Sequence, residues 1–235
     1  MKNYSIIIIL AFFIFFRPLS AQNRKQYNVT FSKEILIFSG GLSLNLISNY
    51  LINNMNPPDT TLLERNHVPV FDRFAIDCHD QFTAHLSDVS LIMSMGLPVI
   101  SILQTDSKAE KQKRVLLYME SVLITSGITN IVKALVHRPR PYAYRKDQEI
   151  LDTNAARSFF SGHTSLAFNG AVVAGMFFEN HQDQSAWHTY VWTAGLTLAS
   201  ATGIFRITSG NHFLSDVIAG ALAGFLTGYL VLKLH

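Results

Sequence analysis

A short polar stretch interrupts the apolar C-terminal part of the chain and places an arginine, a histidine and an aspartate close together. Arg206, His212 and Asp216 follow one another at intervals of six and four residues. If His212 opens the apolar helix that follows, Asp216 lies one turn further along on the same face. Its carboxylate can then accept the N–H of one imidazole nitrogen, which leaves the other nitrogen a lone pair for nucleophilic attack. The planar guanidinium of Arg206 suits a phosphate, although a surface histidine–aspartate pair would show the same spacing.

Two further polar clusters lie upstream, each at the edge of an apolar segment. One has a lysine followed after six residues by Arg-Pro, and the other is Ser-Gly-His; they contribute Lys133, Arg140, Ser161, Gly162 and His163. In this order the three clusters resemble the motifs of the type 2 phosphatidic acid phosphatase and vanadium haloperoxidase superfamily, in its membrane lipid phosphatase branch. The resemblance runs from Lys133 to Asp216.

The resemblance implies a role for each of these residues. The histidine matching His212 attacks phosphorus and forms a phosphohistidine, the aspartate matching Asp216 orients it, and the histidine matching His163 protonates the leaving alcohol. The residues that would hold the phosphate are Lys133, Arg140, Ser161, Gly162 and Arg206. The resemblance implies no metal and no other cofactor.

The residue types themselves support this chemistry. A phosphate monoester carries up to two negative charges, which three cations can neutralise together with the charge that develops in the transition state. A helix that begins at His163 would point its N-terminus at the same anion. Because free histidine titrates at about pH 6.5, two histidines can divide the acid and base roles near neutrality.

The chain departs from the family pattern at two positions. Phe160 stands before Ser-Gly-His, where the family usually has proline, and Phe205 stands before Arg206, where it usually has serine. Neither position carries the nucleophile, the acid or a cation. We interpret both as tolerated substitutions that bear on substrate preference.

Composition points to a membrane protein of one domain. Of the 235 residues, 49% are hydrophobic and only 15% are charged, whereas soluble domains carry about 25% charged residues. The net charge is +3, and no basic stripe is interleaved with aromatic residues, so nucleic acid is not an expected partner. The single cysteine, Cys78, excludes an internal disulfide and a thiolate zinc cluster.

Residues 1–21 have the pattern of a secretory signal, with a positive charge, an eleven-residue apolar run and small residues at the end. An uncleaved anchor is the alternative, although such a run is short for a hydrocarbon core of about 30 Å. Beyond the signal we expect an N-terminal helix and a polar periplasmic segment over residues 22–87. A phosphatase helical core that carries all three motifs is expected over residues 88–235.

Apolar segments of helical length recur along the rest of the chain, and no period-two alternation indicates a strand. They cover residues 35–52, 89–104, 115–132, 164–178, 187–205 and 217–232. We therefore predict an all-α, membrane-associated bundle of about five to six helices. Small residues recur every four positions before Arg206 and after Asp216, a pattern that lets helix backbones approach closely in lipid.

Charge predicts the orientation of this bundle in a bacterial inner membrane. The stretch from Lys108 to Arg114 is predicted to be a loop with four basic residues, which the positive-inside tendency places in the cytoplasm. The following helices then alternate in direction and bring all three motifs to the periplasmic face. With a cleaved signal the mature N-terminus lies outside, so segment 35–52 would not cross the membrane. If this segment does cross, either the signal is uncleaved or the number of membrane crossings has the other parity.

Other polar residues have plainer interpretations. His137 is expected to be a solvated neighbour of the first cluster, and Arg138 and Arg145 to be surface cations or headgroup contacts. Glu120 lies in an apolar helix and should face the bundle or water, because a lipid-facing carboxylate is costly. An acidic and histidine-bearing run has a spacing that fits no compact metal motif. It contains Asp72, Asp77, His79, Asp80, His85 and Asp88.

The leading hypothesis is a membrane phosphatase that acts on a phospholipid or polyprenyl phosphate at the periplasmic leaflet. Phosphatidic acid, phosphatidylglycerol phosphate, undecaprenyl pyrophosphate and the lipid A phosphates all remain candidates. One alternative is a soluble periplasmic acid phosphatase, which the apolar segments oppose. Others are a vanadate-dependent haloperoxidase and a non-enzymatic lipid-binding module, the latter opposed by the complete set of nucleophile, orienter and acid. The sequence does not predict an oligomeric state.

Overall fold

The computed structural model describes residues 27–59, 61, 63–145, 152–179 and 186–235. Within these residues the chain is all-helical, as predicted, and has no strand. The α-helices are α2 (Phe31–Asn53), α3 (Gln81–Leu103), α4 (Lys108–Val136), α5 (Gly162–Glu179), α6 (Ala186–Thr208) and α7 (Leu214–Lys233). Short 3₁₀ helices occupy the connections: η2 (Arg65–His67), η3 (Arg73–Asp77), η4 (Pro141–Tyr144) and η5 (Thr153–Ala156). The predicted signal, residues 1–21, lies outside the described residues.

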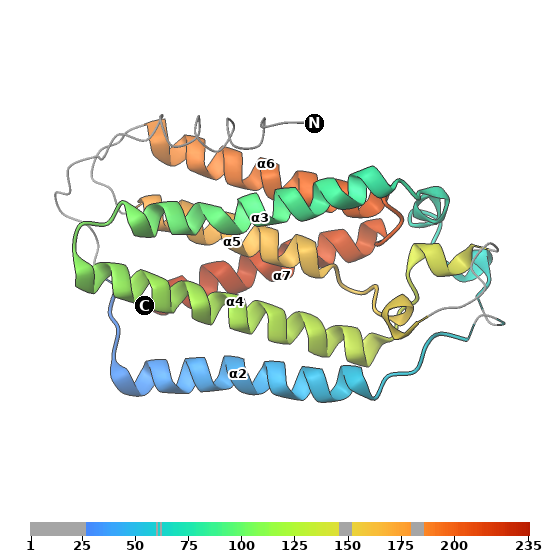
Figure 1. Cartoon of the computed structure of the whole chain (residues 1–235), viewed down its shortest axis with the longest axis horizontal. Coiled ribbons are helices and arrows are strands. Elements are labelled where there is room, and N and C mark those ends of the chain that lie inside the picture. Colours follow the sequence, from blue (N-terminus) through green and yellow to red (C-terminus); the bar gives the residue numbers. More distant parts are fainter. Residues whose placement is uncertain (1–26, 60, 62, 146–151, 180–185) are drawn as a thin grey trace, which may run out of the picture.

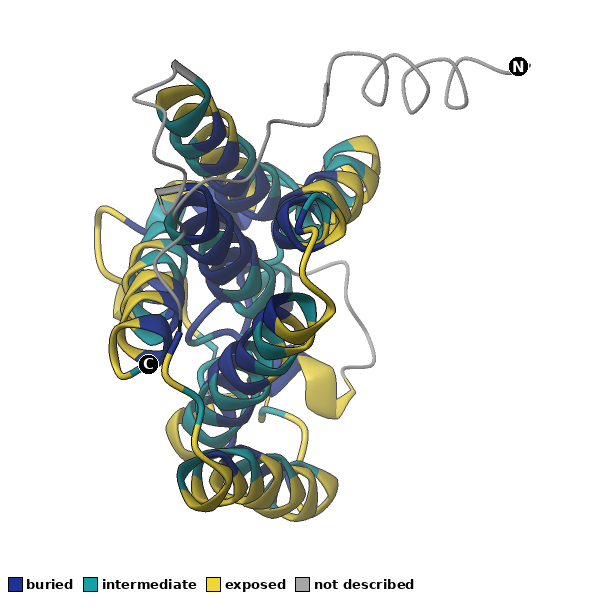
Figure 2. Ribbon diagram, turned by 90° about the vertical axis from the view of Figure 1, so that its left-hand side faces the viewer, coloured by how far each residue is buried: buried dark blue, intermediate teal, exposed yellow. Residues whose placement is uncertain are grey.

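Helix α5 forms the centre of the bundle, and α3, α4, α6 and α7 pack around it (Figures 1 and 2). Most of its side chains are small or apolar, and many are fully buried, including Ala167, Ala171, Val172, Val173 and Phe177. Helix α2 lies outside this arrangement and packs against α4. The start of α5 therefore lies close to the ends of α4 and α6 and to the beginning of α7.

Small residues bring α7 into backbone contact with α5, as the four-residue pattern predicted. A Cβ added to Gly220 would lie 2.6 Å from the carbonyl oxygen of Ser161, and one added to Gly224 would lie 1.9 Å from that of Ser165. No side chain fits at either position without a shift of backbone. The contact therefore fixes the beginning of α7 beside the beginning of α5.

The stretch predicted to be a basic loop is instead the first two turns of α4, so that prediction is wrong. Ser107 caps this helix by accepting the backbone N–H of Glu110 at 3.4 Å, the arrangement typical of a serine three residues before a glutamate. Arg114 is fully buried, its Nη1 donates to Ser101 Oγ at 2.8 Å, and its guanidinium lies over the Phe177 ring. Arg114 therefore does not count as a cytoplasmic loop cation, and only the three lysines of this stretch do.

Helix α3 also begins earlier than its apolar segment predicted. The Asp80 side chain caps it by accepting the backbone N–H of Phe82 at 2.9 Å. The first turns of α3 thus lie in the stretch that we expected to be a polar periplasmic segment. These turns carry Ser87 and Asp88, which reach the candidate site described below.

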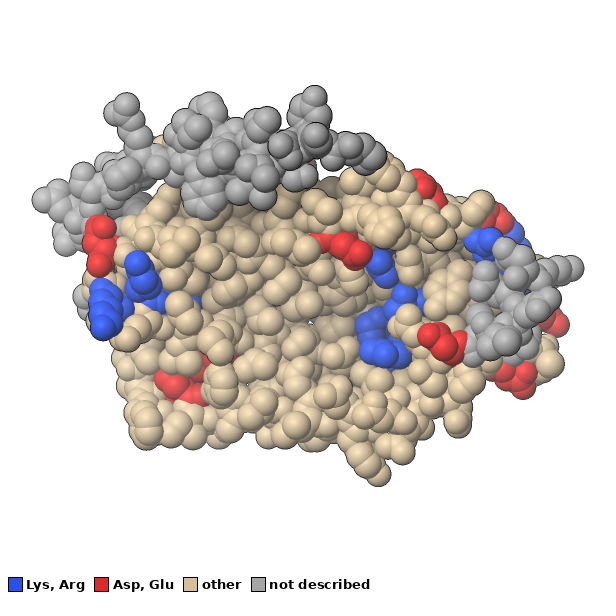
Figure 3. Space-filling view, viewed as in Figure 1, with Lys and Arg blue, Asp and Glu red and all other residues tan. Residues whose placement is uncertain are grey.

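Four helices, α2, α3, α4 and α7, are long and apolar enough to cross a bilayer. Their outward faces expose large apolar side chains such as Phe31 and Leu36 on α2 and Ile92 on α3. Figure 3 shows a broad uncharged middle on one face, with charged side chains toward its ends. We therefore treat the chain as an integral membrane protein with several helical spans. Helix α2, which contains the segment expected not to cross if the signal is cleaved, is a continuous helix of 23 residues.

Candidate active site

The three motif clusters lie at the same end of the bundle, on the right in Figure 1, where α4 and α6 end and α5 and α7 begin. His212 occupies the connection between α6 and α7 and is only 1% exposed. Its backbone N–H donates to the carbonyl of Arg206 at 3.1 Å. Its Nδ1 lies 3.6 Å from Asp216 Oδ2, which is longer than a hydrogen bond. His212 Nδ1 has no hydrogen-bond partner among the residues that the structure describes.

Asp216 is held by donors other than His212. Its Oδ1 accepts from Arg138 Nη1 at 2.5 Å. Its Oδ2 accepts from Ser158 Oγ at 2.5 Å and from the backbone N–H of Phe213 at 2.9 Å. The carboxylate is completely buried, and these donors compensate the cost of removing its charge from water. They also fix the distance at which it faces His212.

Arg138 joins Asp216 to a second buried carboxylate. Its Nη2 donates to Asp72 Oδ2 at 2.8 Å, and its guanidinium lies 4.3 Å from the centre of the Phe213 ring. Asp72 also accepts from the backbone N–H and the Oγ of Ser215, at 3.0 and 2.6 Å. The prediction of Arg138 as a surface cation is therefore wrong. No local spacing could reveal its role, because its partners come from distant parts of the sequence.

Lys133 and Arg140 are both buried beside this centre. Lys133 Nζ donates to the carbonyl of Arg157 at 2.6 Å. Arg140 donates from Nη1 to Asn211 Oδ1 at 3.1 Å and from Nη2 to Asn154 Oδ1 at 2.9 Å. An ammonium has three donors and a guanidinium five, so both cations keep donors for an anion.

Arg206 completes the group of predicted cations, and its Nη1 donates to Ser87 Oγ at 3.3 Å. The Nε atoms of Arg206 and Arg140 are buried and have no hydrogen-bond partner within the described part of the chain. The Nε of Arg157 is in the same state, and sequence reasoning did not single out this residue. Unsatisfied buried donors of this kind favour an anionic ligand.

The electrostatic surroundings keep His212 neutral. Burial lowers the pKa of His212 well below its ordinary value of 6.5, and the charges of Lys133, Arg140 and Arg206 lower it further. Only the neutral imidazole has a lone pair with which to attack. The arrangement thus supplies a neutral histidine among cations at neutral pH.

The Ser-Gly-His cluster forms the start of α5. The backbone N–H of Ser161 donates to the carbonyl of Asp216 at 3.0 Å, and Ser161 Oγ accepts from Thr164 Oγ1 at 2.9 Å. Gly162 is the first residue of α5, so its N–H belongs to the helix end that favours anions. A Cβ at Gly162 would lie 3.5 Å from Thr129 Cγ2, so the protein itself has room for a side chain there.

His163 lies nearer the surface than His212, because its side chain is 34% exposed and that of His212 only 2%. His163 Nε2 lies 2.9 Å from Asp88 Oδ1 on α3. Burial and the charge of Arg206 lower the pKa of His163 to about 4 in spite of Asp88, which raises it. Sequence reasoning did not connect Asp88 with this histidine.

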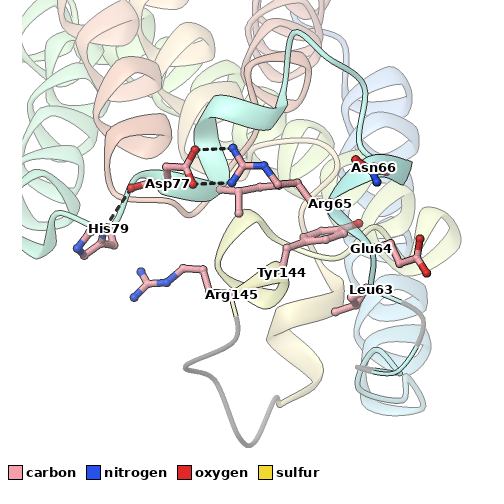
Figure 4. Close-up of a pocket in the computed structure, with 9 residues that line it drawn as sticks. Leu63, Glu64, Arg65, Asn66, Asp77, His79, Tyr144 and Arg145 are labelled. Atoms are coloured by element: carbon pink, nitrogen blue, oxygen red, sulfur yellow. Dashed lines mark hydrogen bonds and ion pairs between the residues drawn. The ribbon is translucent and has the colours of Figure 1, made fainter.

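A cavity of about 740 Å³ lies beside η4, the 3₁₀ helix that directly follows Arg140. It is lined by residues 63–66, Ile76, Asp77, His79, Tyr144 and Arg145 (Figure 4). Within this lining, Arg65 Nη1 and Nη2 donate to the two carboxylate oxygens of Asp77 at 2.7 and 2.6 Å. None of the predicted site residues lines the cavity, and Tyr144, the last residue of η4, connects it along the chain to Arg140.

The other residues that the sequence singled out lie as follows. His137 is exposed and ends α4 in the left-handed conformation, with φ of 49°, which fits the predicted solvated position. Phe160, at one family departure, is buried and packs edge-on against Phe159. Phe205, at the other departure, is half-buried. Glu120 is fully buried inside the bundle, which confirms that it does not face lipid.

Comparison with known proteins gives this geometry a family context. A sequence model described as the PAP2 superfamily matches residues 114–235, which include all three motif clusters. Over 107 residues the chain is 37% identical to the lipid A 1-phosphatase of Porphyromonas gingivalis, which covers 46% of this chain and 20% of that protein. Over 139 residues it is 28% identical to the probable diacylglycerol pyrophosphate phosphatase 1 of Schizosaccharomyces pombe, which covers 48% of this chain and 50% of that protein. The chain thus spans half or less of the length of these two relatives.

The fold is also similar to that of a solved structure. The transmembrane PAP2-type phosphatidylglycerolphosphate phosphatase from Bacillus subtilis superimposes with a TM-score of 0.53. The two chains are 18% identical, and the match covers 83% of this chain and 94% of the other. At this level of identity the likeness concerns the fold alone.

Proposed function

Because the chain belongs to the PAP2 superfamily, we propose that it is a lipid phosphatase that works without a metal ion. It hydrolyses a phosphomonoester or pyrophosphate of a membrane lipid through a phosphohistidine on His212. The observation that carries this proposal is the burial of a neutral His212 among Lys133, Arg140 and Arg206, all of which lower its pKa. A phosphate bound among these cations would lie next to the imidazole.

The first step transfers the phosphoryl group to the enzyme. The lone pair of His212 attacks phosphorus, an N–P bond forms, and the P–O bond to the lipid breaks. The remaining N–H faces Asp216 across 3.6 Å, and this distance shortens as the ring becomes positively charged, since catalytic hydrogen bonds often tighten only in the reacting complex. The cations and the start of α5 stabilise the charge on the phosphoryl oxygens.

His163 gives its proton to the leaving oxygen in this step. In the free protein its pKa is about 4, so the histidine is mainly neutral at pH 7. A phosphate dianion offsets the charge of Arg206, which lowers this pKa, and Asp88 at 2.9 Å favours the imidazolium. The acid is therefore charged mainly when substrate is bound. In the second step water attacks the phosphohistidine, His163 takes the proton of this water, and inorganic phosphate leaves.

Chemistry and the relatives support the proposed substrate class. Both named relatives act, by their names, on phosphorylated lipids, and the cavity beside η4 has room for a headgroup. Phosphatidic acid, phosphatidylglycerol phosphate, undecaprenyl pyrophosphate and the lipid A phosphates all present a terminal phosphate to such a site. We place the site at the periplasmic face, because Lys108, Lys111 and Lys113 lie at the opposite end of α4.

The test is phosphate release from membranes. Membranes that carry the full chain are washed with high salt and assayed in EDTA with each of the four lipids and with a soluble aryl phosphate. We expect activity in the washed membranes that favours a lipid, and none with His212→Ala. Brief reaction with ³²P-labelled lipid and an alkaline quench should leave acid-labile label on the wild type alone. Activity in the soluble fraction that favours the aryl phosphate, or wild-type turnover by His212→Ala, would refute the proposal.

A further inference from the structure

Three side chains that commonly bind metals meet toward the end of the bundle opposite Lys133, Arg140 and Arg206. They are Glu34 in the first turn of α2, Glu120 within α4 and His235 just after α7. One ligand atom from each lies within 4.8 Å of the other two. Their side chains are 8%, 0% and 0% exposed. We refer to these three residues as the far-end cluster.

The tautomer of His235 directs a lone pair into this cluster. Its Nδ1 lies 2.6 Å from the carbonyl oxygen of Val231. A carbonyl can only accept, so Nδ1 carries the hydrogen and neutral Nε2 keeps a lone pair. That atom lies 3.1 Å from Glu34 Oε2 and 3.7 Å from Glu120 Oε2. Metal-binding histidines typically show this arrangement, with one nitrogen bonded to a carbonyl and the other facing the ion.

The carboxylates lack the donors that buried carboxylates usually have. Neither oxygen of Glu120, nor Oε1 of Glu34, accepts a hydrogen bond from any residue within the described ranges. Lys33, which directly precedes Glu34 in the first turn of α2, donates its Nζ to the carbonyl of Leu234. Two buried carboxylates and a lone pair at such short range repel one another unless a proton or a metal cation lies between them.

We propose that the far-end cluster binds one divalent transition-metal ion, of which Zn²⁺ is the type. Bonds of about 2.0–2.1 Å in a tetrahedron place ligand atoms about 3.3 Å apart, and the two distances from His235 Nε2, 3.1 and 3.7 Å, lie on either side of this value. Imidazole with carboxylates suits Zn²⁺ better than Mg²⁺ or Ca²⁺. Two carboxylates also neutralise the ion.

The ion has a structural role, separate from the proposed hydrolysis. It joins the first turn of α2, the middle of α4 and the end of α7, where α2 otherwise packs against α4. Glu120 and Lys133 are both on α4 and are separated by thirteen residues, or about 20 Å along the helix. An ion at this distance touches neither the phosphate nor His212.

Zinc binding to the full chain, without an affinity tag, tests the site. Protein in detergent is stripped with a chelator, dialysed and titrated with ZnCl₂ in competition with a chromophoric chelator. We expect one ion per chain, and affinity reduced about tenfold or more by Glu120→Gln and by His235→Gln. The control is His67→Gln, because His67 is exposed and lies 3.6 Å from Glu64 in a surface pair; it should bind zinc like the wild type.

Two measurements on the unaltered chain do not depend on whether a variant folds. Co²⁺ should give visible d–d bands of a four-coordinate site, and Zn²⁺ should remove them. Zinc should also raise the melting temperature, whereas chelation should leave phosphate release unchanged at temperatures well below melting. Absence of stoichiometric binding would overturn the proposal. Equal zinc affinity in the wild type and both cluster variants would overturn it as well.

Discussion

The two ends of this bundle each bury a histidine against a carboxylate, and the two pairs differ in everything that surrounds them. His212 lies 3.6 Å from Asp216, and His235 lies 3.1 Å from Glu34. Cations surround the first pair and lower the pKa of its histidine. A second carboxylate, that of Glu120, adjoins the other pair at 3.7 Å.

The partners of the carboxylate decide what each pair can do. Asp216 receives donors on both oxygens, from Arg138, Ser158 and a backbone N–H. Its position is fixed, and the adjacent histidine remains free to react. At the far end both oxygens of Glu120 lack donors within the described residues, so the same kind of pair is suited to binding a cation.

Removal of Arg138 is the most direct way to make Asp216 resemble Glu120, and it should have the largest effect. Arg138→Ala deprives Asp216 and Asp72 of their shared donor. We expect kcat to fall about 100-fold, because a small displacement of a positioning group is enough for such a loss, with KM nearly unchanged. Steady-state kinetics on the best lipid substrate measures this.

Rescue experiments on the Arg138 variants distinguish a positioning role of this side chain from a general loss of folded structure. Arg138→Lys should recover little, since an ammonium cannot bridge two carboxylates as a guanidinium does, whereas added guanidinium ion should restore part of the rate to Arg138→Ala. Arg73→Ala is the control, because the Arg73 side chain donates to the backbone carbonyls of Val68 and Asn66 and to no carboxylate among the described residues. Similar losses of kcat in both alanine variants would contradict the assigned role.

A pair of glycine substitutions compares tight and open packing within the bundle. A Cβ at Gly224 would lie 1.9 Å from the carbonyl oxygen of Ser165, whereas one at Gly96 on α3 would meet no atom within 4 Å. Gly224→Ala should destabilise the protein by about 2–3 kcal/mol, because backbone cannot move aside easily. Gly96→Ala should be nearly neutral or slightly stabilising, since the position has room and alanine favours the helix. Thermal melting in detergent measures both, and an equal loss would contradict the difference.

The smallest expected effect is on the pH dependence of stability. Because the pKa of His212 lies well below 6.5 in the folded protein, the unfolded chain binds this proton first as the pH falls. Stability is therefore intact above about pH 6.5 and decreases below it. The melting temperature of the wild type should fall a few degrees further between pH 7.5 and pH 5 than that of His212→Gln. Parallel pH profiles would show that His212 is not kept neutral by its surroundings.

Local spacing explains what the sequence could predict. The helices follow from apolar runs of helical length, and the approach of α7 to α5 follows from glycines at four-residue intervals. The ends of the helices were harder to predict than the helices themselves, because a capping residue can start a helix within a polar stretch. Ser107 caps α4 at the start of a stretch rich in lysine. The sequence could also predict that Glu120 avoids lipid, but not that Glu34 and His235 meet it.

Partners far apart in the chain explain what it could not predict. Asp72 reaches Arg138 and Asp88 reaches His163 across 66 and 75 positions. No periodic pattern links such residues, so only the folded arrangement reveals them. For the same reason Asp72 and Asp88 stand in the sequence as members of one acidic run, although they bind different basic side chains.

The large sequence separation of these contacts determines which fragment of the protein could keep the site intact. Asp72, Ser87 and Asp88 complete the candidate site, yet all three precede residues 114–235, the segment that carries the family signature. A fragment cut at the edge of that signature would retain every motif residue and lose the groups that contact Arg138, Arg206 and His163. The smallest piece that could be transplanted with its chemistry intact must therefore begin before Asp72. Related chains that share the signature but differ upstream would have evolved other supports for the same reaction.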